Sequence, residues 1–222
     1  GMQIDPANLG PVATIILYAV SIAGVGWAVR HFGWRILATD SRQFHVFAAC
    51  AVSLMVLWSI RAQAQPGPGL HVLGVTTVTL LAGLAPACLI TLVAQAVTSL
   101  LMGDAAGIAP SWVVSSLLPI LVTESWRRLV LRCLPADPFA FIFGSAFFGA
   151  AIAVTSVHLV AMLLLGSPAD IWPGAVSGWP GLILLLAFPE AFINGALMTL
   201  LVVYCPDAVR GYASTYESRP RL

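Results

Sequence analysis

The sequence predicts an all-α protein, a polytopic bundle of about seven transmembrane helices with its N-terminus outside and its C-terminus in the cytoplasm. Two observations lead to this fold class. Of the 222 residues, 59% are hydrophobic and only 9% are charged, whereas a typical soluble domain is about 25% charged. So few charges cannot cover a water-exposed surface, and a hydrocarbon solvent removes that need. The second observation is the placement of the arginines, which gives the orientation.

The crossings are predicted from apolar segments, because a helix needs about 20 residues to cross the bilayer core. The expected crossings are 11–29, 44–60, 71–83, 86–102, 111–125, 138–165 and 181–204. The first is a run without any charged residue. The second is separated from the third by the turn-rich stretch QAQPGPG.

The third and fourth crossings come from one apolar run, residues 71–102. This run is too long for one crossing and too short for two full ones. Gly83 and Pro86 lie at its middle, where a helix is expected to break. We therefore expect an unusually short third helix followed by a longer fourth one.

The last three crossings alternate with polar loops. A loop at 103–110 carries Asp104, and the fifth crossing contains Pro119 and ends close to Glu124. Arg127 and Arg128 follow Glu124 at helical spacing, so an ion pair is expected there. The sixth and seventh crossings are joined by a loop at 166–180.

Arginine placement orients the bundle, since the chain contains no lysine. With seven crossings, nine of the ten arginines fall on one side. These nine are Arg30, Arg35, Arg42, Arg127, Arg128, Arg132, Arg210, Arg219 and Arg221. Only Arg61 falls on the other side, so the nine-arginine side is predicted to be cytoplasmic. Merging 71–102 into one crossing would place the arginine clusters on opposite faces.

The chain is predicted to form a single transmembrane domain, residues 1–205, followed by a polar cytoplasmic tail, residues 206–222. The N-terminus lacks the positively charged start of a secretory signal peptide, so the first apolar run is expected to stay as a membrane anchor. Met2 is taken as the initiator, and Gly1 is then expected to be a remnant of expression.

One carboxyl is exceptional for its depth. Glu190 lies ten residues into the seventh crossing, about 15 Å deep and close to the bilayer midplane. A carboxylate there costs roughly 2.5–3.5 kcal/mol, so it should face a partner or a cavity. Asn194 lies one turn further on the same face. Two interpretations remain open: a protonated Glu190 that clamps neighbouring helices, or a direct role in a substrate or metal site.

Other polar residues are expected in the outer half of the bundle. His158 lies about seven residues from the outer end of the sixth crossing, His71 opens the third, and Asp104 follows the fourth. A protein that receives something from outside would place a site there. The sequence shows no nucleophile motif and no phosphate loop, so active transport would need a partner subunit. A net charge of +1 argues against a nucleic-acid partner.

Several motifs resemble a known family. They are 69–83 (GLHVLGVTTVTLLAG), 95–104 (QAVTSLLMGD), 147–151 (FFGAA), 188–197 (FPEAFINGAL) and 201–207 (LVVYCPD). Together they resemble the CbiM-type substrate-specific membrane component of energy-coupling factor (ECF) transporters, which are ABC-type transporters for cobalt or nickel. The form Phe-Pro-Glu-Ala-Phe looks closest to a proteobacterial branch of that family, and the cobalt and nickel members are linked to cobalamin biosynthesis.

The resemblance implies a binding site and partners. Co²⁺ or Ni²⁺ would be the substrate rather than a permanently bound cofactor, taken up from the outer side. The amine of Met2 and the imidazole of His71 would be metal ligands, and Gln3 stands where the family has a histidine. Glutamine is a poorer ligand than imidazole for these ions. A transmembrane coupling protein and two cytoplasmic ATPases would drive inward release, in the bacterial inner membrane.

Two other function classes are considered. The chain could be an intramembrane enzyme that uses Glu190 with His158 or His71, or a non-catalytic membrane assembly or sensor protein. Partner dependence separates these classes, because an enzyme would turn over alone. The transport interpretation assigns no catalytic residue and treats Glu190, Asn194, His158 and Asp104 as substrate-site or structural polar groups.

Overall fold

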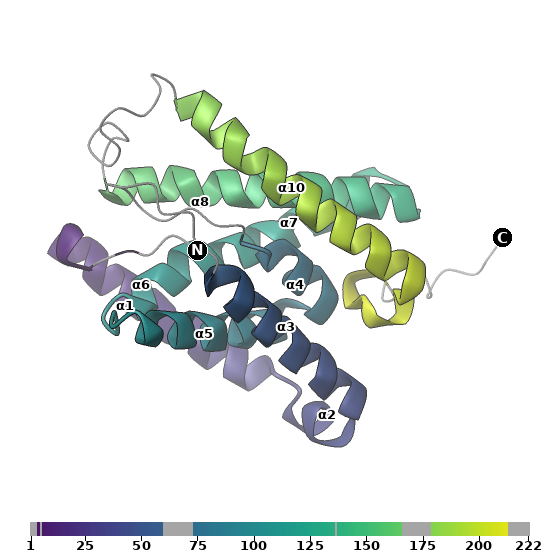
Figure 1. Ribbon diagram of the computed structural model, residues 1–222, viewed down its shortest axis with the longest axis horizontal. Coiled ribbons are helices and arrows are strands. Elements are labelled where there is room, and N and C mark those ends of the chain that lie inside the picture. Colours follow the sequence, from purple (N-terminus) through teal and green to yellow (C-terminus); the bar gives the residue numbers. More distant parts are fainter. Residues whose placement is uncertain (1–3, 5, 60–72, 136, 166–178, 213–222) are drawn as a thin grey trace.

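The computed structural model describes residues 4, 6–59, 73–135, 137–165 and 179–212. Within these ranges the chain forms helices and turns, without a strand (Figure 1). The elements are η1 (Pro6–Asn8), α1 (Pro11–His31), α2 (Trp34–Thr39), α3 (Ser41–Ser59), α4 (Val75–Ala82), α5 (Leu84–Leu101), α6 (Ile108–Trp112), η2 (Val113–Leu117), α7 (Leu118–Cys133), η3 (Ala140–Phe148), α8 (Gly149–Leu165), α10 (Trp179–Tyr204) and η4 (Pro206–Ala208). Six helical segments of the described chain are long and apolar enough to cross a bilayer, which confirms the predicted polytopic helical bundle.

The predicted short third crossing is α4. It has 8 residues and is therefore about 12 Å long, less than half a bilayer core. Gly83 separates it from α5 with φ 87° and ψ 174°, a conformation that favours glycine. The six long segments and this short helix account for the seven predicted crossings.

The fifth crossing is longer than predicted. We expected a loop to residue 110 and a helix to about residue 125, but the helix runs without interruption through α6, η2 and α7 to Cys133. The hydrophobic pattern of the sequence ends at Glu124, whereas the backbone hydrogen bonds of the helix continue to Cys133. The segment η2 is a π-helical turn just before Pro119. A wider turn leaves room for the proline ring, which would otherwise crowd the carbonyl four residues earlier.

The sixth and seventh crossings are neighbours. η3, a π-helical segment, continues into α8, and α10 packs against both (Figure 1). A Cβ added to Gly195 on α10 would lie 3.2 Å from the Phe147 ring, so the two backbones come close there. Inside α10, Pro189 removes one backbone N–H donor.

The arginine-bearing ends of the crossings meet at one end of the bundle. Arg210, which follows α10, lines a small cavity together with Gly33, between α1 and α2, and Gln43 in the first turn of α3. A Cβ added to Gly211 would lie 3.6 Å from the side chain of Arg127. This arrangement agrees with the predicted orientation, in which these arginines are cytoplasmic.

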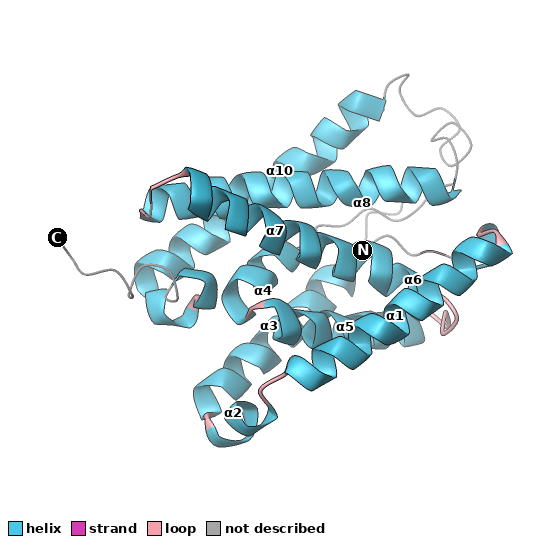
Figure 2. Ribbon diagram, turned by 180° about the vertical axis from the view of Figure 1, so that it is seen from behind, coloured by secondary structure: helices cyan, strands magenta, loops and turns pink. Residues whose placement is uncertain are grey.

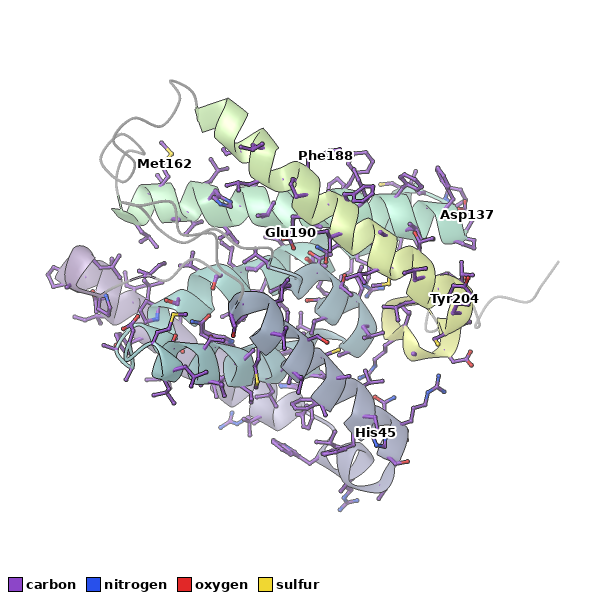
Figure 3. All side chains as sticks on the ribbon, in the orientation of Figure 1. His45, Asp137, Met162, Phe188, Glu190 and Tyr204 are labelled. Atoms are coloured by element: carbon purple, nitrogen blue, oxygen red, sulfur yellow. The ribbon has the colours of Figure 1, made fainter. Side chains whose placement is uncertain are left out.

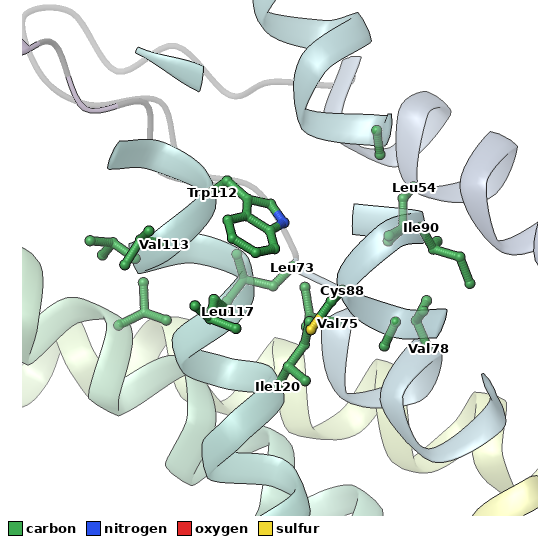
Figure 4. Packing of buried hydrophobic residues seen from close by; sticks show 14 of the residues in the cluster. Leu54, Leu73, Val75, Val78, Cys88, Ile90, Trp112, Val113, Leu117 and Ile120 are labelled. Atoms are coloured by element: carbon green, nitrogen blue, oxygen red, sulfur yellow. The ribbon is translucent and has the colours of Figure 1, made fainter. Parts of the chain in front are cut away.

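The main core lies where α3, α4, α5 and α7 converge. Leu73, Val75, Cys88, Trp112 and Ile120 belong to one buried cluster there (Figure 4). The short α4 is enclosed by these helices, so its polar groups need partners from the other helices. Seen from behind, α7 lies in front of α8 and α10 (Figure 2).

Candidate functional site

The carboxyl of Glu190 binds the start of α4. Leu73 N–H donates to Oε2 at 2.6 Å, and Gly74 N–H donates to Oε1 at 2.8 Å. Glu190 is 3% exposed and points into the bundle, whereas Phe188 points away from it (Figure 3). The predicted interior position of Glu190 is thus confirmed.

The first turn of α4 needs this acceptor because its sequence supplies none. Backbone N–H groups at a helix start have no partner within the helix. The N-cap residue of α4 is Gly74, which has no side chain that could cap the helix. Its φ of 64° lies in the left-handed region that favours glycine. A carboxylate at a helix N-terminus also interacts favourably with the helix dipole. Glu190 therefore replaces a local cap with one from a helix more than a hundred residues away in sequence.

Asn194 extends the same contact by one turn. Its Oδ1 accepts hydrogen bonds from Thr77 N–H at 2.9 Å and from Thr77 Oγ1 at 2.7 Å. Its Nδ2 donates to the carbonyl oxygen and to Oε1 of Glu190, both at 2.8 Å. Asn194 is fully buried. The two side chains that the sequence placed on one face thus form one network that joins α10 to α4.

The protonation state follows from the partners. Among the described residues, all hydrogen-bond partners of the Glu190 carboxyl are donors: two backbone N–H groups and one amide NH₂. An ionised carboxylate accepts at both oxygens, whereas a protonated one must also donate. The geometry therefore favours an ionised clamp over the protonated one considered from the sequence.

Trp58 holds the other side of the same peptide segment. Its Nε1–H donates to the carbonyl oxygen of Leu73 at 3.0 Å, and Trp58 is 1% exposed. Leu73 is thus bonded by α10 through its N–H and by α3 through its carbonyl. Sequence reasoning missed Trp58, because an apolar ring near the end of a crossing gives no sign that its N–H has a distant backbone partner.

The N-terminal segment has its own buried anchor. Ile4 is fully buried, and its N–H donates to Ser111 Oγ at 2.8 Å. Ser111 lies in α6, next to Trp112 of the main core. Sequence reasoning missed this contact as well. The only available signal was a serine at the start of a crossing, which usually serves its own helix.

His158 is not brought to Glu190. Gly195 of α10 lies against Phe147, so in this antiparallel pair Glu190 is level with about residue 152. His158 is six residues further, about 9 Å along the helix axis. His158 is buried, and its Nδ1–H donates to the Val154 carbonyl at 2.7 Å. This contact lies within its own helix.

Asp104 stabilises a turn. Its Oδ1 accepts a hydrogen bond from Gly107 N–H at 2.8 Å, just before α6 begins. The predicted metal ligands Met2 and His71, together with Gln3, lie outside the described residues. Among the residues that the structure does describe, no group of three or more His, Cys, Asp or Glu side chains could hold a metal ion.

The fold and this cluster define a class of protein: a multi-pass membrane protein in which buried polar side chains hold the backbone of Ile4, Leu73 and Gly74. The family described as "Cobalt uptake substrate-specific transmembrane region" (CbiM) matches residues 4–208. The chain belongs to that family. It is the substrate-specific membrane component for uptake of a transition metal and a multi-pass protein of the bacterial inner membrane.

Two solved structures share the fold. One, described as a truncated transition metal transporter, is 15% identical with a TM-score of 0.69 and covers 91% of this chain and 99% of its own. The other, described as a transition metal transporter, is 14% identical with a TM-score of 0.65 and covers 99% of this chain and 100% of its own. A comparison with curated proteins found no match.

Proposed function

We propose that this chain binds Co²⁺ or Ni²⁺ from the outer side through the Met2 amine and the His71 imidazole. In this proposal a transmembrane coupling protein and two cytoplasmic ATPases drive the release of the ion into the cytoplasm. The metal is the transported substrate. Imidazole and amine nitrogens suit these ions better than carboxylate oxygens do.

The observation that carries the proposal is the position of the two buried anchors. Leu73 and Gly74, bound by Glu190, come two and three residues after His71. Ile4, bound by Ser111, comes two residues after Met2. A metal site with few protein ligands depends on outer groups that hold those ligands in place. The anchors act next to the two segments that carry the proposed ligands.

Glu190 is then a positioning residue and not a metal ligand. Both of its oxygens accept backbone N–H groups, and among the described residues no group of three or more His, Cys, Asp or Glu side chains surrounds it to hold a metal. The same hydrogen bonds speak against Glu190 as a catalytic acid or base. The separation of about 9 Å along the helix axis also speaks against a proton pair with His158.

Uptake in intact cells tests the proposal. Cells without their own high-affinity uptake would express the chain from Met2, alone or with its coupling protein and ATPases, and accumulation of radioactive Co²⁺ or Ni²⁺ would be measured. We expect accumulation only with all subunits, and none when the ATPases are inactivated. The proposal would be wrong if the folded, membrane-inserted assembly accumulates neither metal, or if the chain alone accumulates as much as the assembly.

A further inference from the structure

An apolar groove lies on the surface between α7 and α8, in the half of the bundle toward the arginine-bearing end. Its volume is about 360 Å³, and it is lined by Leu121, Val122, Ser125, Trp126, Leu129 and Ile152. α7 and α8 lie side by side in Figure 2 and are in extensive contact. Leu121 and Leu129 are both exposed. Because these helices cross the membrane, the open side of the groove faces lipid.

The wall of the groove is held in place. Trp126 Nε1–H donates to the Gly144 carbonyl in η3 at 2.9 Å. A Cβ added to Gly149 would lie only 3.3 Å from the Trp126 ring, so the ring lies directly on the backbone of α8. The indole therefore forms an apolar wall of the groove that is bonded to the neighbouring helix.

Two arginines lie at the cytoplasmic end of this groove. Arg128 follows Ser125 by three residues and Arg132 follows Arg128 by four, so both lie beyond the lining residues, on the edge of α7 that carries Leu121 and Ser125. The side chain of Arg128 is 63% exposed. It donates to Glu124 through Nε, and among the described residues its terminal nitrogens have no other partner. Arg132 is exposed and makes no ion pair within the described chain.

The charges at this end are unbalanced. Glu124 is bonded by both Arg127 and Arg128, and Arg132 adds a third positive charge, so with Asp137 at the start of η3 this end carries three arginines against two carboxylates. From Leu121 to Arg132 the helix rises about 16 Å. One leaflet of the hydrocarbon core is about 15 Å thick. The groove with its arginines therefore has the length and charge order of a single inner-leaflet lipid.

We propose that this groove binds one anionic phospholipid of the cytoplasmic leaflet, with an acyl chain along Trp126 and Ile152 and the phosphate on Arg128 and Arg132. Basic pockets beside transmembrane helices on the cytoplasmic side suit such headgroups. The alternative occupant, a helix of a partner protein, would present apolar side chains but would not need two exposed arginines at one end.

Native mass spectrometry of the purified full chain tests the site. The protein would be titrated with phosphatidylglycerol, with phosphatidylcholine of the same acyl chains, and with glycerol phosphate as a headgroup without chains. Wild type should retain phosphatidylglycerol selectively. The double variant Arg128→Gln/Arg132→Gln should bind it about 25-fold more weakly, since each arginine contributes roughly fivefold near an anionic headgroup. Glycerol phosphate should not compete.

The second variant, Ser125→Trp, fills the groove and keeps both arginines, and it should lose selective retention too. The matched controls are Arg30→Gln/Arg35→Gln, which removes two exposed arginines elsewhere at the same end, and Leu163→Trp, at a position that is 82% exposed near the far end of α8. Both controls should bind like wild type. Equal binding by all variants would overturn the proposal. So would an equal loss in the controls, or a Ser125→Trp variant that still retains phosphatidylglycerol selectively.

Discussion

Glu190 accepts three hydrogen bonds inside the bundle, so its replacements should differ in a defined order. Glu190→Gln puts an NH₂ donor against either Leu73 N–H or Gly74 N–H, leaving one donor without an acceptor. We expect a loss of roughly 1–3 kcal/mol. Glu190→Leu leaves both N–H groups unmatched and should be worse. Thermal unfolding in detergent should give the highest melting temperature for wild type, a lower one for Glu190→Gln and the lowest for Glu190→Leu.

The control for Glu190 is Thr199→Val on the same helix. Thr199 Oγ1 donates only to the Gly195 carbonyl of its own helix, so the substitution should change the melting temperature little. If wild type, Glu190→Gln and Glu190→Leu melt together, the carboxyl does not hold α4 and the clamp is wrong.

Trp58 offers a separate measure of how firmly Leu73 is held. Trp58→Phe keeps an aromatic ring but removes the Nε1–H bond to the Leu73 carbonyl. The expected loss of stability is about 1 kcal/mol. It should exceed the loss in the surface control Trp34→Phe, because Trp34 Nε1–H donates to the exposed carbonyl oxygen of Val29. Both variants would be compared by thermal unfolding. A larger loss in Trp34→Phe would argue against the role given to Trp58.

The residues of the network were only partly predictable. A carboxyl at the bilayer midplane is rare enough to be noticed in a sequence, and its amide neighbour follows from helical spacing. The partners of Glu190 are backbone N–H groups, which every residue except proline carries. No side-chain pattern could therefore point to Leu73 and Gly74. The roles of Trp58 and Ser111 could not be predicted for the same reason, since each side chain bonds a main-chain atom that is distant in sequence.

The break between α4 and α5 depends on a single residue, Gly83. Its φ of 87° with ψ of 174° is open to glycine and costs other residues about 1–3 kcal/mol. The space itself is adequate, because an added Cβ would lie at an ordinary 3.4 Å from Arg210. Gly83→Ala should therefore lower the melting temperature through the backbone conformation alone.

The matched control is Gly26→Ala within α1, where an added Cβ meets nothing within 4 Å. Alanine is the better helix former by roughly 1 kcal/mol, so this variant should be neutral or slightly stabilised. Equal melting temperatures for the two alanine variants would mean that the turn between α4 and α5 tolerates side chains.

At the scale of elements, hydropathy predicted the crossings, and glycine and proline predicted the break inside 71–102. Hydropathy failed at the end of the fifth crossing because the helix of α7 continues through Arg127, Arg128 and Arg132. Arginine stems can pack on apolar surface while their charged groups reach water. A change in polarity therefore marks the membrane boundary and not the helix boundary.

The orientation of the whole molecule is testable directly. The arginine-bearing ends of α1, α7 and α10 meet at one end, which the positive-inside rule makes cytoplasmic. A fluorescent protein fused to the C-terminus should therefore fluoresce, and alkaline phosphatase fused there should be inactive. The opposite pair of results would reverse the topology and place the Met2 and His71 segments on the inner side.

The measurement that tests the central claim most directly is calorimetric titration of Co²⁺ and Ni²⁺ into the protein that begins at Met2, into the form with Gly1, and into His71→Ala. We expect binding by the Met2 form. We expect weak or no binding with Gly1, because it moves the free amine one residue away from Met2, and Gln3 offers no imidazole in its place. His71→Ala should remove what remains. Tight binding by the Gly1 form that survives His71→Ala would contradict the account and place the site elsewhere, with His158 and Glu190 the next residues to replace.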